Sequence, residues 1–212
     1  MVKKLALAAS LALITFGFAA TPLAGAQPAI NPTLLIDKSH PLEPHDYTPP
    51  ELVVPRVFLA ETPDNNPEMR LAAPAAAALT NLLTAAESDG ITLALSSGYR
   101  SYSDQAALYA SGSVASEAVA RPGYSEHQSG LAADVIPYNY FCAAQGCFAL
   151  SRAAAWLGLN SYRYGLIVRY PLYKEASTGY EYEPWHLRYV GIPLAERLHV
   201  TGQTLEEFYG LP

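Results

Sequence analysis

Apolar residues recur at mixed spacings of three and four between residues 69 and 87, where alanine and leucine predominate. This period predicts an amphipathic helix, which ends at Asp89-Gly90. The short apolar runs that follow are bounded by turn-forming residues and are typical of buried strands. They predict strands over residues 91–95, 131–136, 165–170 and 185–190. Further helices are expected over residues 103–111, 150–157 (stopped by Gly158), 193–199 and 204–209.

These elements lack the regular strand–helix–strand alternation that builds a parallel sheet. We therefore expect an α+β fold with a small, mainly antiparallel central sheet flanked by helices. Residues 27–70 carry a high share of the chain's 17 prolines, and each proline removes a backbone donor and restrains the residue before it. This segment is expected to be an extended arm packed on the core, while residues 71–212 form a single globular domain with it.

The first 26 residues have the order of a secretory signal peptide: two lysines, an apolar run and Ala24-Gly25-Ala26. We expect residues 1–26 to be removed and the protein to reach the periplasm or the cell-wall and extracellular space. A retained anchor is the alternative. The run is interrupted by polar residues, glycine and proline, however, and is shorter than the ~20 apolar residues that a span needs. No stable membrane insertion is expected after cleavage.

The chain has a net charge of −6, and removal of the leader makes it more negative. An acidic exported protein is poorly suited to bind nucleic acid or anionic membranes. The remaining roughly 190 residues can bury the core of one domain without covalent staples, and we expect a monomer.

Cys142 and Cys147 are the only cysteines. In an exported protein this close pair predicts a local disulfide. Zinc ligation by the pair is the alternative, but two thiolates alone do not complete a zinc site.

Two short clusters pair a histidine with a carboxylate: His127 with Asp134, and His186 with Glu183. Together they supply what a hydrolytic zinc site requires, namely three protein ligands, an open position for water and a base. The other histidines are expected to be surface or hydrogen-bonded groups.

The spacing of seven between His127 and Asp134 would place them on opposite faces of one strand. They converge if His127 lies in a turn and Asp134 in the following strand, and Ser129-Gly130 supplies the chain reversal. Glu126 should project away from His127 and is not expected to be the base.

In the second cluster, Pro184 is expected to keep the start of the segment out of the interior of the ladder. Strand alternation then places His186 and Arg188 on one face and residues 185, 187 and 189 on the other. The first face serves the site, where Arg188 either faces the cleft or steadies a ligand from behind, and the second serves the core.

The pattern Ser-x-His-x-x-Gly-x-Ala-x-Asp at residues 125–134, with Glu-x-Trp-His at residues 183–186, resembles the VanY-type D-alanyl-D-alanine carboxypeptidases. These belong to peptidase family M15B of the LAS zinc peptidases. Three further segments are similar to the family: residues 37–42, residues 97–101 with Gln105, and residues 178–182. The resemblance covers roughly residues 33–199 and implies a Hedgehog/DD-peptidase-like fold, with residues 71–212 as the catalytic domain.

The resemblance also implies the roles of seven residues. Zinc (Zn²⁺) would be held by His127, Asp134 and His186. Glu183 would be the general base and acid, and Arg100 the cation beside the scissile carbonyl. Gln105 and Ser125 would hold the terminal part of the substrate.

The activity implied is removal of the C-terminal residue from peptidoglycan stem peptides. An L,D-carboxypeptidase acting on tetrapeptides and a D,D-dipeptidase remain open, because the shape of the subsites decides between them. A non-catalytic, zinc-dependent wall-binding module is the alternative from another class. Glu183 argues against it, since structural zinc sites usually have four protein ligands and need no free carboxylate.

Overall fold

The computed structural model describes residues 27–64, 66–112, 119–142 and 145–211, so the expected signal peptide lies outside the described residues. The central sheet has the strand order β2 (Phe58–Leu59), β4 (Leu93–Ser97), β5 (Ala132–Pro137), β7 (Glu183–Tyr189), β6 (Leu166–Tyr170). β2 pairs with β4 in parallel, and the other neighbours are antiparallel. β1 (Leu52–Val53) and β3 (Leu71–Ala72) form a separate antiparallel pair. The predicted α+β fold with a mainly antiparallel sheet is confirmed.

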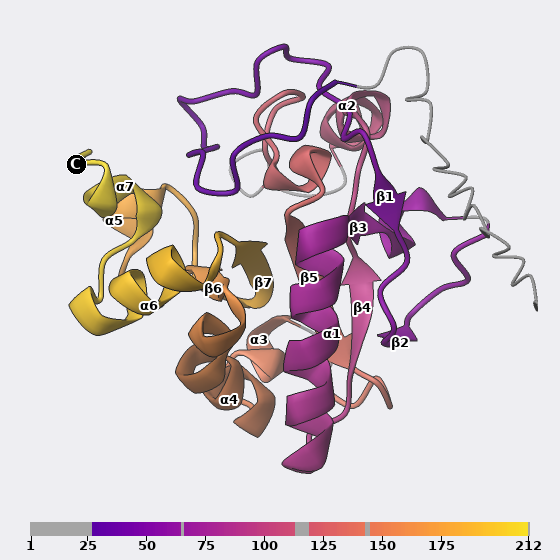
Figure 1. Ribbon diagram of the computed structural model, residues 1–212, viewed down its shortest axis with the longest axis vertical. Helices are drawn as coiled ribbons and strands as arrows, with labels where there is room; N and C mark the ends of the chain where they lie inside the picture. Colours follow the sequence, from indigo (N-terminus) through magenta and orange to yellow (C-terminus); the bar gives the residue numbers. More distant parts are fainter. Residues whose placement is uncertain (1–26, 65, 113–118, 143–144, 212) are drawn as a thin grey trace, which may run out of the picture.

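Helices flank this sheet, with α1 standing in front of it and α6 and α7 at the outer side of β6 (Figure 1). Their bounds are α1 (Ala73–Ser88), α2 (Tyr102–Ser111), α3 (Gln145–Phe148), α4 (Arg152–Asn160), α5 (Glu175–Thr178), α6 (Ile192–Thr201) and α7 (Leu205–Phe208). The described residues also include the 3₁₀ turns η1 (Pro67–Met69), η2 (Glu126–Ser129) and η3 (Ser161–Tyr164). Within the described residues, no helix is both long and apolar enough to cross a membrane.

One face of the sheet forms the main core. Leu79 and Leu82 of α1 and Leu157 of α4 are fully buried against it, together with Val135 of β5 and Leu187 of β7. Because side chains alternate along a strand, the residues between these core positions point to the other face. That alternation frees Asp134 and His186 for the polar site.

The arm packs on the core without helix or strand from residue 27 to residue 51. Its Ile36, Leu42 and Tyr47 are buried. The side-chain amide of Gln128 donates to the Tyr47 carbonyl at 3.1 Å and to that of His45 at 2.7 Å, which holds the arm against η2. The division into an arm and a domain at residue 70 stays a prediction.

Two predicted helix boundaries differ from the structure by three or more residues. α1 begins at Ala73 rather than at residue 69, because the preceding residues pair with β1 and Pro74 suits the first helical turn. α4 continues through Gly158 to Asn160, where η3 follows. A glycine inside a helix lowers its stability without ending it. The end of α1 at Asp89-Gly90 is confirmed.

The predicted disulfide between Cys142 and Cys147 is confirmed. It closes a short loop between β5 and α4.

Near the site, the backbone at Gly98 packs closely against the backbone of residues 68 and 70. Its amide donates to the Glu68 carbonyl at 2.6 Å, and a Cβ at Gly98 would overlap the carbonyl oxygens of Arg70 and Glu68.

We expect Gly98→Ala to lower the free energy of unfolding by about 1–3 kcal/mol, the usual effect of overpacking. Urea denaturation measures this. Gly158→Ala is the control, because its Cβ would meet nothing within 4 Å and should leave stability unchanged or raised. Equal stability of both variants would contradict the close approach.

Candidate metal centre and active site

Two of the three predicted ligands are neighbours across the sheet. Asp134 of β5 and His186 of β7 are partners in the antiparallel ladder, so their side chains rise from the same face. The Nδ1 atom of His186 lies 2.9 Å from Oδ1 of Asp134. The register of the sheet therefore brings together two residues that are 52 positions apart.

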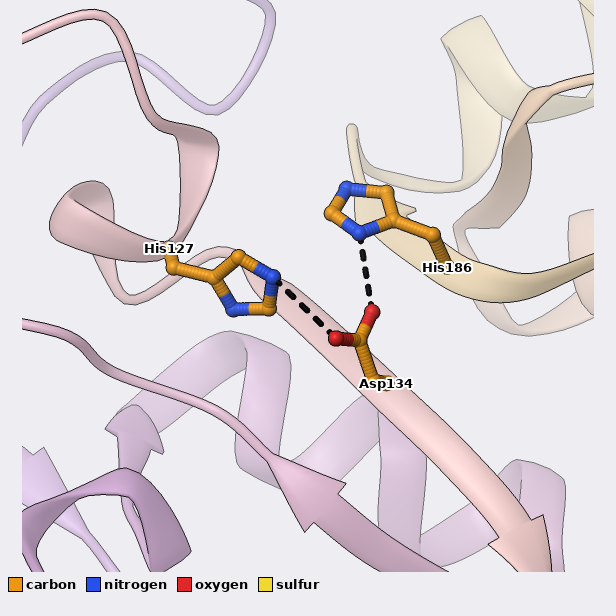
Figure 2. A group of neighbouring side chains, drawn as sticks. All are labelled: His127, Asp134 and His186. Atoms are coloured by element: carbon orange, nitrogen blue, oxygen red, sulfur yellow. Dashed lines mark hydrogen bonds and ion pairs between the residues drawn. The ribbon is translucent and has the colours of Figure 1, made fainter. Parts of the chain in front are cut away.

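The third predicted ligand, His127, comes from the turn η2. Its Nε2 atom lies 3.4 Å from Oδ2 of Asp134, so the two carboxylate oxygens face one imidazole each (Figure 2). Gly130 ends η2 in the left-handed conformation, with φ +71°, and turns the chain into β5. The predicted arrangement of a turn followed by a strand is thus what the structure has.

These three side chains fit a metal ion. One ligand atom from each lies within 4.8 Å of the others. The Nδ1 atom of His127 is 2.6 Å from the Gly98 carbonyl, to which it donates, so Nε2 is the ring nitrogen that a neutral His127 would offer to a metal. Two imidazole nitrogens and one carboxylate oxygen form the ligand set of a three-residue zinc site with an open position.

The charges of the three predicted ligands depend strongly on one another. Burial alone would raise the pKa of Asp134, but the charges and hydrogen bonds of His127 and His186 hold that pKa well below its usual range. Burial would lower the pKa of His186, yet hydrogen bonds with Asp134 and Glu126 raise it to about 10. The cluster therefore attracts positive charge, as a cation site requires.

Glu183 lies at the start of β7 and lines the same cleft, of about 160 Å³, as the three ligands. Its pKa is raised to about 7, chiefly by burial, with His186 opposing the rise. A carboxyl group with this pKa exchanges its proton near neutral pH, which is the property of an effective general base and acid. Contrary to expectation, Pro184 lies within β7, where the register between β6 and β7 shifts.

Arg100 also lines the cleft, just beyond β4. Its Nε donates to Glu68 at 2.8 Å and one terminal nitrogen donates to Ser97 at 2.9 Å. The other donates to the side-chain oxygen of Gln105 at 3.2 Å. These contacts fix the guanidinium in place beside the predicted ligands.

Gln105 and Ser125 line the cleft as well. The amide nitrogen of Gln105 donates to the Ala120 carbonyl at 2.7 Å, so both polar ends of this buried side chain have protein partners. Among the predicted site residues, Gln105 therefore contacts Arg100. Ser125 is buried at the start of η2 and makes no side-chain capping hydrogen bond.

Sequence reasoning missed Glu126 and Tyr170, which both contact His186. Glu126 points away from His127, as expected, but its Oε2 lies 3.3 Å from Nε2 of His186. Burial opposes its charge, yet Arg169, Arg188 and His186 hold the pKa of Glu126 well below its usual range. The Tyr170 ring stacks on the His186 ring, with 5.0 Å between the two ring centroids. One sign of these contacts was present in the sequence, namely the position of Glu126 next to the predicted ligand His127.

Two histidines and an aspartate that could hold one metal ion, with a partly buried glutamate beside them, form the arrangement of a zinc hydrolase centre. The chain belongs to the VanY family, whose description is D-alanyl-D-alanine carboxypeptidase and whose family model matches residues 68–192. The resemblance stated from the motifs is confirmed.

The relatives agree with this assignment. YodJ of Bacillus subtilis (strain 168) is 41% identical over 182 residues, which cover 82% of this chain and 66% of YodJ. The structure of the LD-carboxypeptidase LdcB has a TM-score of 0.77 and 37% identity, covering 90% of this chain and 92% of LdcB. The vancomycin resistance D,D-pentapeptidase VanY, solved as the E175A mutant with Zn(II), has a TM-score of 0.63 and 32% identity, covering 84% and 98%. This chain thus spans slightly under two thirds of YodJ.

Proposed function

We propose that this protein is a zinc-dependent D-alanyl-D-alanine carboxypeptidase that removes the C-terminal residue of peptidoglycan stem peptides. The observation that carries the proposal is the convergence of His127, Asp134 and His186 in one cleft with Glu183 and Arg100. The family description and the zinc-bound VanY relative support both the metal and the D,D-specificity.

In this proposal His127, Asp134 and His186 hold the zinc ion. Bound zinc supplies Lewis-acid chemistry, acidifying water and polarising a carbonyl group. Glu183 accepts a proton as water adds to the scissile carbonyl carbon, and the new C–O bond forms. The carboxyl group then returns that proton to the amide nitrogen as the C–N bond breaks, so the terminal amino acid leaves as a free amine.

Arg100 is the proposed stabiliser of the oxyanion that develops on the carbonyl oxygen. Its guanidinium is held by Glu68 and Ser97 before substrate arrives, and such preorganised donors contribute about 3–4 kcal/mol in comparable sites. Ser125 is proposed to hold the terminal part of the substrate from the wall of the cleft. Gln105 is proposed to act there too, in part by orienting Arg100.

An L,D-carboxypeptidase is the second candidate, because the LdcB structure has a higher TM-score to this chain than the VanY structure has. The test is to incubate the zinc-loaded protein with muropeptides ending in D-Ala-D-Ala and with tetrapeptides, and to identify the released product by mass. We expect free D-Ala from the first substrate and loss of its release with a chelator. Cleavage of tetrapeptides alone would favour the L,D-enzyme, and release of a dipeptide the D,D-dipeptidase. A zinc-bound protein that cleaves neither would favour the wall-binding module.

We also propose that the protein acts outside the cytoplasmic membrane, as a monomer. Support for export comes from the signal-like order of residues 1–26 and from a substrate class that lies in the cell wall. Detection of the mature protein in a periplasmic or culture fraction tests this proposal.

A further inference from the structure

A buried ionic cluster lies directly behind His186. At its centre is Glu126, whose side chain is only 1% exposed. One of its oxygens accepts from Nε of Arg169 and from Nη1 of Arg188, each at 2.7 Å. Its other oxygen lies 3.3 Å from Nε2 of His186. The carboxylate thus joins a predicted metal ligand to two buried arginines.

The remaining donors of the two arginines are also satisfied. Arg169 donates to both carboxylate oxygens of Glu206, at 2.6 and 3.0 Å, and to the Ile36 carbonyl at 3.3 Å. Arg188 donates to the carbonyls of Pro32 and Leu34, at 3.0 and 2.8 Å. Two arginines and two glutamates balance in charge. Three carbonyls of the N-terminal arm and the Tyr189 carbonyl, which accepts from Nε of Arg188 at 3.1 Å, complete the set. Such a network holds its central carboxylate in one position.

An imidazole ring that binds a metal must present an unprotonated nitrogen to it. The hydrogen bond made by the other ring nitrogen decides which of the two nitrogens is unprotonated. In His186, Nδ1 faces Asp134 and Nε2 faces Glu126. A carboxylate at Nε2 accepts the ring proton there, which leaves the Nδ1 lone pair directed at the predicted metal position. The Tyr170 ring packs against the imidazole and limits its rotation.

We infer that Glu126, held by Arg169, Arg188 and the arm, is a positioning residue that sets the tautomer and orientation of His186 for zinc binding. The inference rests on the proposed zinc site, and it gives residues 32–36 of the arm a part in supporting that site. In this inference Glu126 acts through His186 and not directly on the substrate or the metal.

The test compares Glu126→Gln with Glu206→Gln. Glu126 and Glu206 both pair with Arg169, and each substitution removes one of these two buried negative charges. Of the two residues, Glu126 is the one that contacts His186. Zinc affinity is measured by competition with a chelator, on samples shown by circular dichroism to be folded. We expect Glu126→Gln to weaken zinc binding 10–100-fold, as loss of an outer partner of a histidine ligand does. Glu206→Gln should stay within about threefold, since all contacts of His186 remain.

Equal affinity of Glu126→Gln and wild type would overturn the inference, and so would equal losses in both variants. If Glu126→Gln does not fold, Glu126→Asp replaces it, because a shorter carboxylate keeps the charge for the arginines but withdraws from His186. The absorption spectrum of the cobalt-substituted protein should change in the Glu126 variant and not in the Glu206 variant. Since the readout is metal binding, a zinc-bound wild type that cleaves no peptide would refute the proposed function alone.

Discussion

Glu183→Gln is expected to lower turnover by about 10²–10⁴-fold, the contribution of a positioned general base, while zinc stays bound. Glutamine keeps the size of the side chain but accepts no proton from water. The three ligands are unchanged, so zinc content should match that of the wild type. Peptide hydrolysis and metal analysis of the same sample measure both effects.

The matched control is Glu181→Gln, because Glu181 is an exposed carboxylate on the same segment. It should retain wild-type turnover. Unchanged hydrolysis by Glu183→Gln would remove this residue from the mechanism.

The pH profile should carry the signature of the same residue. Burial raises the pKa of Glu183 to about 7, and only its ionised form accepts a proton. As pH falls below that pKa, kcat/KM should therefore drop by about tenfold per pH unit. A bound cation favours the ionised form, so the midpoint in the zinc enzyme should lie at or below pH 7. The residual activity of Glu183→Gln should lack this acidic limb, with zinc content checked at each pH.

His127→Ala is expected to lower the zinc content of the purified protein from one ion per chain to well below one. The substitution removes one of three ligands, so affinity should fall by more than the 10–100-fold seen when an outer partner is lost. His199→Ala is the control, since that exposed ring stacks on Tyr162 away from the cluster. Full metal content in His127→Ala would rule out its assignment as a ligand.

The metal cluster could be predicted because its geometry follows from local rules. Gly130 marks the reversal after His127, and strand alternation separates His186 from the core-facing Leu187. Both rules depend on neighbouring residues, and both agree with the structure. The spacing alone did not give the cross-strand pairing of Asp134 with His186, which depends on the register of β5 against β7.

The surroundings of Arg100 and Gly98 could not be predicted in this way. Glu68, which holds Arg100, lies 32 positions earlier in the turn η1, within the segment expected to be an extended arm. The apolar period of residues 69–87 begins at the last residue of that turn, but Pro74 and the pairing of β3 with β1 delay the helix. Nothing in the local pattern shows that the chain there approaches Gly98.

The sequence by itself determined the class of fold, the disulfide, and the types and order of the groups at the site, because these depend on local periodicity, turn residues and motif spacing. Only the tertiary structure decided that Glu126 faces His186 and that two arginines and the arm lie behind it. Arg169 and Arg188 are 43 and 62 positions from Glu126, and the arm carbonyls are farther from the arginines still. A buried carboxylate is stable only where distant partners converge on it, and that convergence is a property of the packed chain.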